Sequence, residues 1–149
     1  MPAWALAVIV IVPSLVFGLG LSWLLIAKHR EPALEPAERV VREQFARLMV
    51  DRKWSRYGNG RAFLTTSRIE WIRSRIPYPV GFLSQTIQLD EIESVDIGEP
   101  IRWGAPHTLL IQASGHSYDF EFDPILSDGA AGWLSAVSLL LEERNAVEA

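Results

Sequence analysis

The acidic residues of the C-terminal part could bind a hard cation, because carboxylate oxygens are the ligands that Ca²⁺ and Mg²⁺ prefer. Asp119, Glu121 and Asp123 alternate along one predicted strand, so their side chains share one face. No loop glycine and no companion ligand set accompanies them, and the same spacing is typical of the solvated face of a strand. We therefore expect a solvated face and no metal site.

Side chains that could serve in catalysis do not form a known pattern. The three histidines, His29, His107 and His116, show no metal-ligand spacing, and the chain contains no cysteine. A Gly-x-Ser-x-Gly elbow, a phosphate-binding glycine loop and a His-Glu-x-x-His helix are also absent from the sequence. The sequence predicts no catalytic residue, no cofactor and no enzyme.

One polar segment, 98–106, carries large apolar side chains that no strand or helix period would bury. These are Ile101 and Trp103, with Arg102 between them. Two interpretations remain open. The three residues form an interaction loop, or the indole packs back over the open end of a β-barrel.

The N-terminal segment from Ala3 to Ala27 contains no charged residue or histidine. As a helix it would extend roughly 37 Å, enough to cross a hydrocarbon core of about 30 Å. The alternative is a cleaved secretory signal, which requires a charged start, a shorter apolar core and a small-residue cleavage site. We predict a single transmembrane helix.

Positive charges follow this segment, at Lys28 and Arg30, and only the N-terminal amine precedes it. The positive-inside rule then predicts a single-pass protein of the cell membrane, with its N-terminus outside and its C-terminal domain in the cytoplasm. Within the predicted span Ser14, Gly18 and Ser22 recur at every fourth residue, which could allow two helices to pack closely. A homodimer is one expectation from this spacing, and chance occurrence of small residues is the other.

Charge is unevenly distributed over the rest of the chain. Residues 28–75 hold twelve basic and six acidic residues, whereas 76–149 hold two basic and twelve acidic ones. The basic half lies next to the predicted membrane segment, where it can attract anionic lipids. An overall pI near 5.4 argues against a nucleic-acid partner.

After a proline-containing linker at 31–37, we expect one domain made mainly of strands. Gly58-Asn59-Gly60 predicts a tight turn. The alternation of apolar and polar residues predicts strands at 62–66, 68–73, 83–89, 92–97, 108–113 and 117–122. A C-terminal helix follows, with Ser127 or Asp128 as its N-cap. Its apolar stripe consists of Trp133, Leu134, Val137, Leu140 and Leu141. Residues 38–50 fit either a helix or a strand.

The motif at 60–71, Gly-Arg-Ala-Phe-Leu-Thr-Thr-Ser-Arg-Ile-Glu-Trp, resembles bacterial pleckstrin-homology-like and GRAM-like domains. The step at 87–95 and the strand pair around 109–111 and 118–120 resemble the same family. The resemblance covers roughly 38–145 and implies a strongly bent β-barrel or sandwich capped by one helix. It also implies that 38–50 is at least partly the first strand. The predicted organisation is a membrane anchor with a basic flank (1–30), a linker (31–37), the domain (38–145) and a tail (146–149).

By the same resemblance, a basic loop between the first two strands would bind anionic headgroups. The matching positions are Arg52, Lys53, Trp54, Arg56, Tyr57 and Arg61. Basic side chains would meet phosphates while the aromatic ones settle at the interface. An ordinary solvated loop is the alternative interpretation.

The sequence thus predicts a non-enzymatic, membrane-tethered adaptor that binds a protein partner or anionic lipid at the cytoplasmic membrane face. The alternative is an accessory subunit of a membrane complex that is recognised through its transmembrane helix, with the barrel as a spacer.

Overall fold

The computed structural model describes residues 31–53, 57–73, 84–123 and 128–148. In chain order the elements are β1 (Val40–Val50), β2 (Tyr57–Thr65), β3 (Arg68–Arg73), β4 (Ser84–Gln88), the 3-10 helix η2 (Leu89–Glu91), β5 (Ile92–Gly98), β6 (Thr108–Ala113), β7 (His116–Phe122) and the helix α2 (Gly129–Glu148). All of them belong to one compact unit, residues 32–73 and 78–149.

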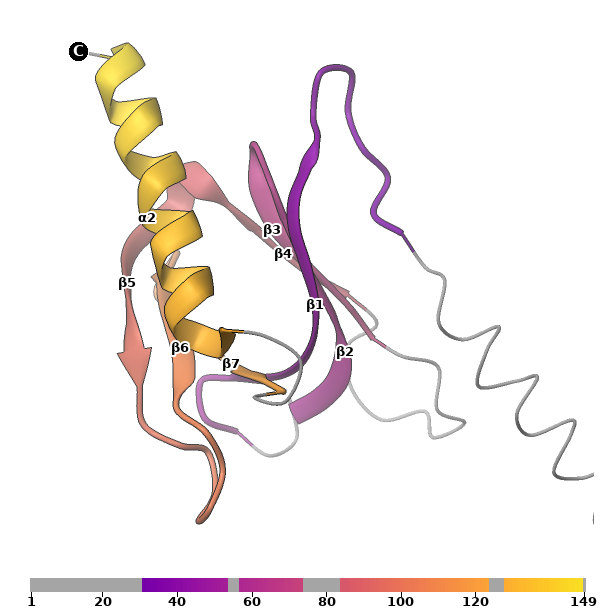
Figure 1. Cartoon of the computed structure of the whole chain (residues 1–149), viewed down its shortest axis with the longest axis vertical. Coiled ribbons are helices and arrows are strands. Elements are labelled where there is room, and N and C mark those ends of the chain that lie inside the picture. The colour runs from indigo at the N-terminus through magenta and orange to yellow at the C-terminus, as the bar shows by residue number, and fades with distance from the viewer. Residues whose placement is uncertain (1–30, 54–56, 74–83, 124–127, 149) are drawn as a thin grey trace, which may run out of the picture. The chain divides into compact units, whose positions relative to one another are not determined.

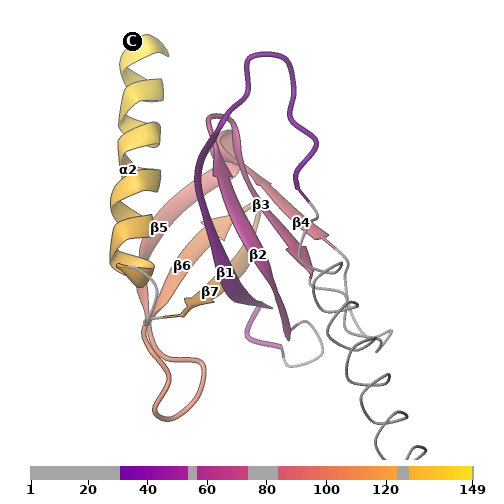
Figure 2. The same ribbon diagram turned by 45° about the vertical axis from the view of Figure 1, so that its right-hand side comes forward.

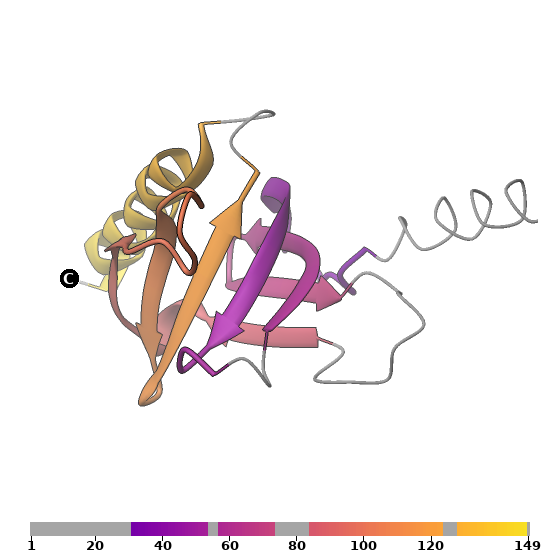
Figure 3. The ribbon, with the colours of Figure 1, turned by 90° about the horizontal axis from the view of Figure 1, so that it is seen from below.

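The strands form one antiparallel sheet in the order β4-β3-β2-β1-β7-β6-β5. Its central strand, β1, pairs with β2 along one edge and with β7 along the other, and Figure 3 shows β1 and β7 side by side. Leu48, for example, lies opposite Gly58 on β2 and Phe120 on β7. β1 therefore joins the two halves of the sheet, β2–β4 and β5–β7.

Helix α2 packs against the second half of the sheet, on β5, β6 and β7 (Figures 1 and 2). Trp133 is fully buried and stacks on Phe122, with ring centroids 4.7 Å apart. Its indole N–H donates to Oε1 of Gln44 on β1 at 2.9 Å. Arg42 also forms an ion pair with Asp128, which directly precedes the helix. The start of α2 is thus fixed to both β7 and β1.

The segment at 38–50, which fitted either periodicity, is a strand from Val40 onward. Ala46, Leu48 and Val50 point into the core and are buried, in the two-residue period of a strand. The helical spacing of the apolar residues does not decide the structure of this segment, because distant strands supply hydrogen-bond partners along both of its edges.

The predicted turn at Gly58-Asn59-Gly60 is wrong, because these residues lie inside β2. The glycines are needed for packing: a Cβ on Gly60 would lie 2.6 Å from Cε2 of the buried Trp71. The turn itself lies earlier, at Asp51 and Arg52, which both have positive φ, and Lys53 N–H donates to the Val50 carbonyl at 3.1 Å.

The mainly β architecture with one C-terminal helix is confirmed. The transmembrane part of the predicted fold class, and the single-pass membrane location that depended on it, are not supported and are corrected here. Within the described ranges, no helix is long and apolar enough to cross a bilayer. The segment at 3–27, which contains Ser14, Gly18 and Ser22, lies outside the described residues. The accessory-subunit function, which depends on this segment, stays a prediction.

A buried carboxylate fixes the segment before β1 to the β2–β3 turn. The Glu38 side chain is 3% exposed and accepts hydrogen bonds from the hydroxyls of Thr65 at 2.6 Å and Ser67 at 2.5 Å. Arg68 lies 3.3 Å from its other oxygen and donates to the Ala33 carbonyl at 2.6 Å. The predicted linker is therefore held against the domain at Ala33.

The same contacts shift the titration of Glu38. Burial alone would raise the pKa of this carboxyl. The hydrogen bonds from Ser67, Thr65 and the Glu35 N–H, together with the charge of Arg68, lower the pKa from 4.5 to about 2. The ionised carboxylate therefore stabilises the folded state fully above about pH 4.5, and this contribution is lost as the pH falls toward 2.

We predict that Glu38→Gln lowers the free energy of unfolding by about 1 to 3 kcal/mol at neutral pH, because buried donors lose a charged acceptor. Urea unfolding of the full chain measures this value. The difference between wild type and variant should shrink as the pH falls from about 4.5 toward 2. Glu35→Gln is the matched control, since that side chain is 75% exposed and 3.9 Å from Arg68. An equal loss in both variants would contradict the assignment.

Candidate functional site

Two loops that are far apart in sequence meet at one end of the domain. They are the β1–β2 turn and residues 99–107 between β5 and β6, called here the Trp103 loop, and both lie at the lower end of the views in Figures 1 and 2. Arg52 connects them: its Nη2 donates to the Glu99 carbonyl at 3.3 Å and to Asp119 Oδ1 at 2.9 Å. The tertiary structure thus brings together parts of the two regions that the sequence singled out separately.

The β1–β2 turn is also held from the β7 side. Asp51 accepts the Ser117 N–H at 3.1 Å and contacts Nδ1 of His116 at 3.0 Å. The hydrogen bond from the Ser117 N–H, followed in size of effect by the one from His116, holds the pKa of Asp51 below its ordinary value. The position of Arg52 is therefore fixed by contacts on both sides of the turn.

The Trp103 loop is fixed at both ends and at its turn. Thr108 donates to the Glu99 carbonyl at 3.3 Å, and His107 Nδ1 lies 3.1 Å from the Gly98 carbonyl. At the turn, the Ala105 N–H donates to the Arg102 carbonyl at 3.1 Å. Trp103 lies at the tip and its relative exposure is 101%. Of the two interpretations of this residue, packing over the barrel end is wrong, and the indole projects into solvent.

The acidic face of β7 is buried, contrary to the expected solvated face. Asp119 is fully buried and Glu121 is 3% exposed. Asp119 Oδ1 accepts from Arg52 and, at 3.2 Å, from Thr108. Both carboxylates lie on the side of the sheet opposite the core, and their arginine partners come from β1, the β1–β2 turn and the Trp103 loop. No cluster suited to a metal ion occurs in the described part of the chain.

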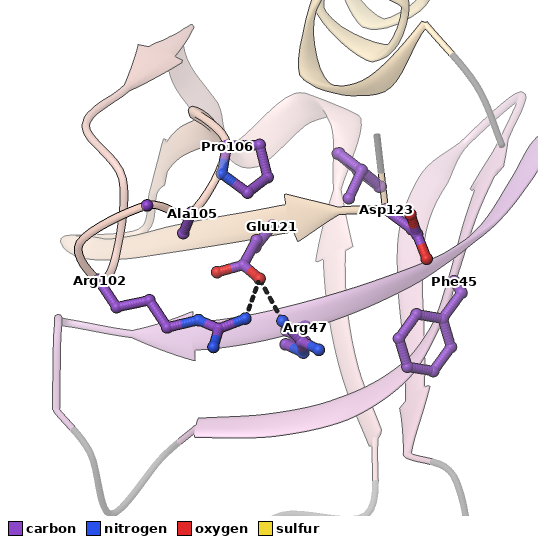
Figure 4. A pocket seen from close by; sticks show the side chains of 9 residues that line it. Phe45, Arg47, Arg102, Ala105, Pro106, Glu121 and Asp123 are labelled. Atoms are coloured by element: carbon purple, nitrogen blue, oxygen red, sulfur yellow. Dashed lines mark hydrogen bonds and ion pairs between the residues drawn. The ribbon is translucent and has the colours of Figure 1, made fainter. Parts of the chain in front are cut away.

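Glu121 anchors a small pocket beside the Trp103 loop (Figure 4). Its Oε1 accepts from Arg47 Nη1 at 2.5 Å and lies 3.4 Å from Arg102 Nη2. The pocket has a volume of about 160 Å³. Besides these three side chains, its lining comes from Phe45, Gly104, Ala105, Pro106, Phe122 and Asp123.

The sequence missed this pocket. Its pattern predicts no site at Arg47 or Phe45, although it does place alternating carboxylates on β7. The sequence does contain one clue, because acidic residues alternate on the β7 segment and an arginine, Arg47, lies in the β1 segment. That signal becomes specific only when the register places Arg47 directly opposite Glu121.

The predicted basic cluster is only partly assembled. Lys53 is exposed next to Arg52, whereas Arg61 lies in the middle of β2, pairs with Glu43 and sits over the Phe63 ring. Tyr57 is the first residue of β2, and Trp54 and Arg56 lie outside the described residues. A lipid-binding role for this set stays a prediction. In the other predicted set, Ile101 is half-buried and the Arg102 side chain is 55% exposed.

Comparisons with known proteins agree at the level of fold. No family model matches the sequence, and no curated protein matches it. Among solved structures, the Vps36 N-terminal PH domain superposes with a TM-score of 0.60 and 20% identity, over 78% of this chain and 88% of that one. The chain has a pleckstrin-homology-like fold.

Other solved structures are similar too. The C-terminal domain of an unknown protein from Leishmania infantum gives a TM-score of 0.50 and 12% identity, over 70% of this chain and 85% of that one. The hSac2 domain from the human phosphoinositide phosphatase Sac2 gives 0.47 and 17%, over 89% and 83%. The superposition on the Vps36 PH domain confirms the predicted pleckstrin-homology-like fold, and the GRAM-like subtype and bacterial origin stay predictions.

We predict that Arg52→Ala lowers the free energy of unfolding by about 2 to 4 kcal/mol, because it leaves the buried Asp119 carboxylate without its counterion. Lys53→Ala, which removes an exposed neighbouring charge, should change stability by less than about 0.5 kcal/mol.

Adding Asp119→Asn to Arg52→Ala should recover part of the loss, since a neutral amide needs no counterion. Thermal or urea unfolding of the full-length wild type, Arg52→Ala, Asp119→Asn and the double variant completes the double-mutant cycle. Strict additivity of the two substitutions would show that the ion pair does not couple the turn to β7.

Proposed function

We propose that this pleckstrin-homology-like domain is a non-catalytic binding module that recognises a protein partner through the Trp103 loop. The observation that carries the proposal is the full exposure of Trp103 on a loop that hydrogen bonds and an ion pair hold in place. Solvent exposure of a whole indole is unfavourable, and tryptophan is among the residues most enriched at the centres of protein interfaces.

The fixed loop supports recognition for an energetic reason. Binding normally costs the ordering of side chains and loops at the interface. Here the base of the loop is already bound to Arg52 and Thr108, and Arg102 next to the indole is paired with Glu121. Little further ordering is required when a partner packs on Trp103.

Charge favours a protein partner over an anionic membrane surface. Arg52 of the β1–β2 turn and Arg102 of the Trp103 loop are paired with the buried carboxylates Asp119 and Glu121. Lys53 is exposed next to Arg52. Both arginines that the structure describes in these two loops are thus paired, which leaves the exposed indole as the main apolar contact.

We predict that Trp103→Ala weakens partner binding by at least about thirtyfold, the effect of losing a central tryptophan at an interface. A photo-crosslinking amino acid in place of the exposed Lys53, in the β1–β2 turn at the same end of the domain, would keep the indole and capture the partner, and mass spectrometry would identify it. Calorimetry with the purified partner then measures the affinities of wild type and variant.

Leu139→Ala is the matched control, because Leu139 is 55% exposed on α2. Its affinity should remain that of the wild type. Equal affinity of all three proteins would overturn the proposal.

A second prediction concerns lipids. Flotation of the full chain with vesicles of phosphatidylcholine alone, or with added phosphatidylserine, should show no preference for the anionic vesicles, because Arg52 and Arg102, the arginines described at this end, are paired. Capture by anionic vesicles only, lost in Lys53→Ala and Trp103→Ala, would instead show that the surface binds anionic lipid.

A further inference from the structure

The pocket beside the Trp103 loop lies next to the proposed recognition residue. Arg102 and Gly104, the neighbours of Trp103 on either side in the chain, line this pocket, whereas the indole itself does not. Another part of the wall is Phe45 of β1, whose side chain is 41% exposed, and Figure 4 shows Phe45 and Arg102 on opposite sides of Glu121. A partner that packs on Trp103 therefore meets this pocket as well.

The accessible surface of the pocket consists of apolar side chains and guanidinium groups. Phe45 is exposed and Pro106 is half-buried. The side chains of Arg47 and Arg102 are 34% and 55% exposed. Glu121 is only 3% exposed and is paired with both arginines, so its carboxylate offers almost no surface to a ligand. A bound group would therefore touch apolar atoms and arginine side chains.

The charges of the lining residues oppose a charged ligand. Arg47 and Arg102 supply two positive charges, and Glu121 and Asp123 supply two negative charges. A bound cation would be repelled by the two guanidinium groups, and a bound anion would be repelled by the two carboxylates. The pocket is thus best matched by an uncharged side chain.

The guanidinium of Arg102 favours an aromatic ring over a saturated side chain. Its Nη2 donates to Glu121 at 3.4 Å, and the N–H donors of a guanidinium lie in the plane of the group. Such an in-plane contact leaves the flat faces of the group for other neighbours. Aromatic rings bind these faces by stacking and by cation–π attraction, which an aliphatic side chain does not provide.

The size of the pocket fits one six-membered ring. Its volume is about 160 Å³. An apolar cavity of about 150 Å³ in another protein binds one benzene molecule. The ring of a phenylalanine or tyrosine therefore matches the pocket in volume as well as in charge.

We propose that this pocket binds the aromatic ring of a phenylalanine or tyrosine of the protein partner. The ring would pack against Phe45 and Pro106 and present one face to the Arg102 guanidinium. This inference rests on the proposed function, because Arg102 and Gly104, which line the pocket, belong to the loop that presents Trp103. One partner segment would contact the indole and place its ring in the pocket.

Phenol and cyclohexanol, two uncharged six-membered rings of similar size, test the ligand chemistry. Each is titrated into the ¹⁵N-labelled full chain while backbone amide resonances are followed by NMR. Phenol should shift the amides of Phe45, Arg47, Gly104 and Ala105 with a dissociation constant on the order of 10 mM. Cyclohexanol should bind there at least about threefold more weakly, because it lacks the attraction to a guanidinium. Equal or tighter binding of cyclohexanol, or no shift of these amides with phenol, would overturn the inference.

Variants locate the ring in the pocket. Ala105→Leu should fill the pocket from the loop and weaken phenol binding by about tenfold or more. Phe45→Ala, which removes an exposed wall residue with little risk to folding, should also weaken it. Arg102→Met keeps an apolar stem but removes the guanidinium, so the preference for phenol over cyclohexanol should fall. Leu139→Ala, an exposed position on α2, is the control and should bind phenol as the wild type does. Unchanged phenol binding in both Ala105→Leu and Phe45→Ala, or an unchanged preference in Arg102→Met, would contradict the assignment.

Calorimetry with the purified partner links the pocket to recognition. Ala105→Leu and Phe45→Ala should weaken partner binding by about tenfold, because the partner's ring loses its site. Wild-type partner affinity in variants that no longer bind phenol would show that the partner does not use the pocket.

The two proposals can fail separately. If Trp103→Ala loses the partner and phenol never binds, the aromatic-ring inference is wrong and the proposed function stands. If phenol binds in the predicted pattern and Trp103→Ala keeps the partner, the pocket chemistry stands and the proposed recognition through Trp103 is wrong.

Discussion

Strand β1 is hydrogen-bonded to β2 along one edge and to β7 along the other, and the rest of the domain depends on this double pairing. Its inward side chains Ala46 and Leu48 belong to the common core of both sheet halves. Gln44, on the same side, holds the indole of Trp133 and so positions α2. Without β1, the half formed by β2–β4 and the half that carries the helix would share no backbone hydrogen bonds in the described chain.

The outward side of β1 and β7 carries a second layer of structure, and its interactions are ionic. Arg47 faces Glu121 directly across the two strands and is also hydrogen-bonded to Asn59 on β2 at 3.0 Å. Buried carboxylates need such partners, since an uncompensated buried charge is strongly destabilising. The Trp103 loop covers this layer and contributes Arg102 to it. The ion pairs and hydrogen bonds that stabilise the buried carboxylates therefore also hold the Trp103 loop in place.

The apolar core and the proposed recognition residue lie in different parts of the domain. The apolar core and the β1 pairings form the pleckstrin-homology-like scaffold, while the exposed indole of Trp103 lies on the loop between β5 and β6. A fixed loop with an exposed aromatic residue provides apolar contact area at little cost in ordering.

Local periodicity in the sequence determined the mainly β architecture, the inward Tyr118, Phe120 and Phe122 of β7 and the amphipathic C-terminal helix, because strand and helix periods are properties of neighbouring residues. The tertiary structure decided that 40–50 is a strand, since its partners come from two distant segments. It also decided that Gly60 makes room for Trp71 rather than a turn. The site was decided in the same way. Asp119 and Glu121 are buried because a loop and two arginines from elsewhere in the chain cover them, and no local pattern records which segments will meet.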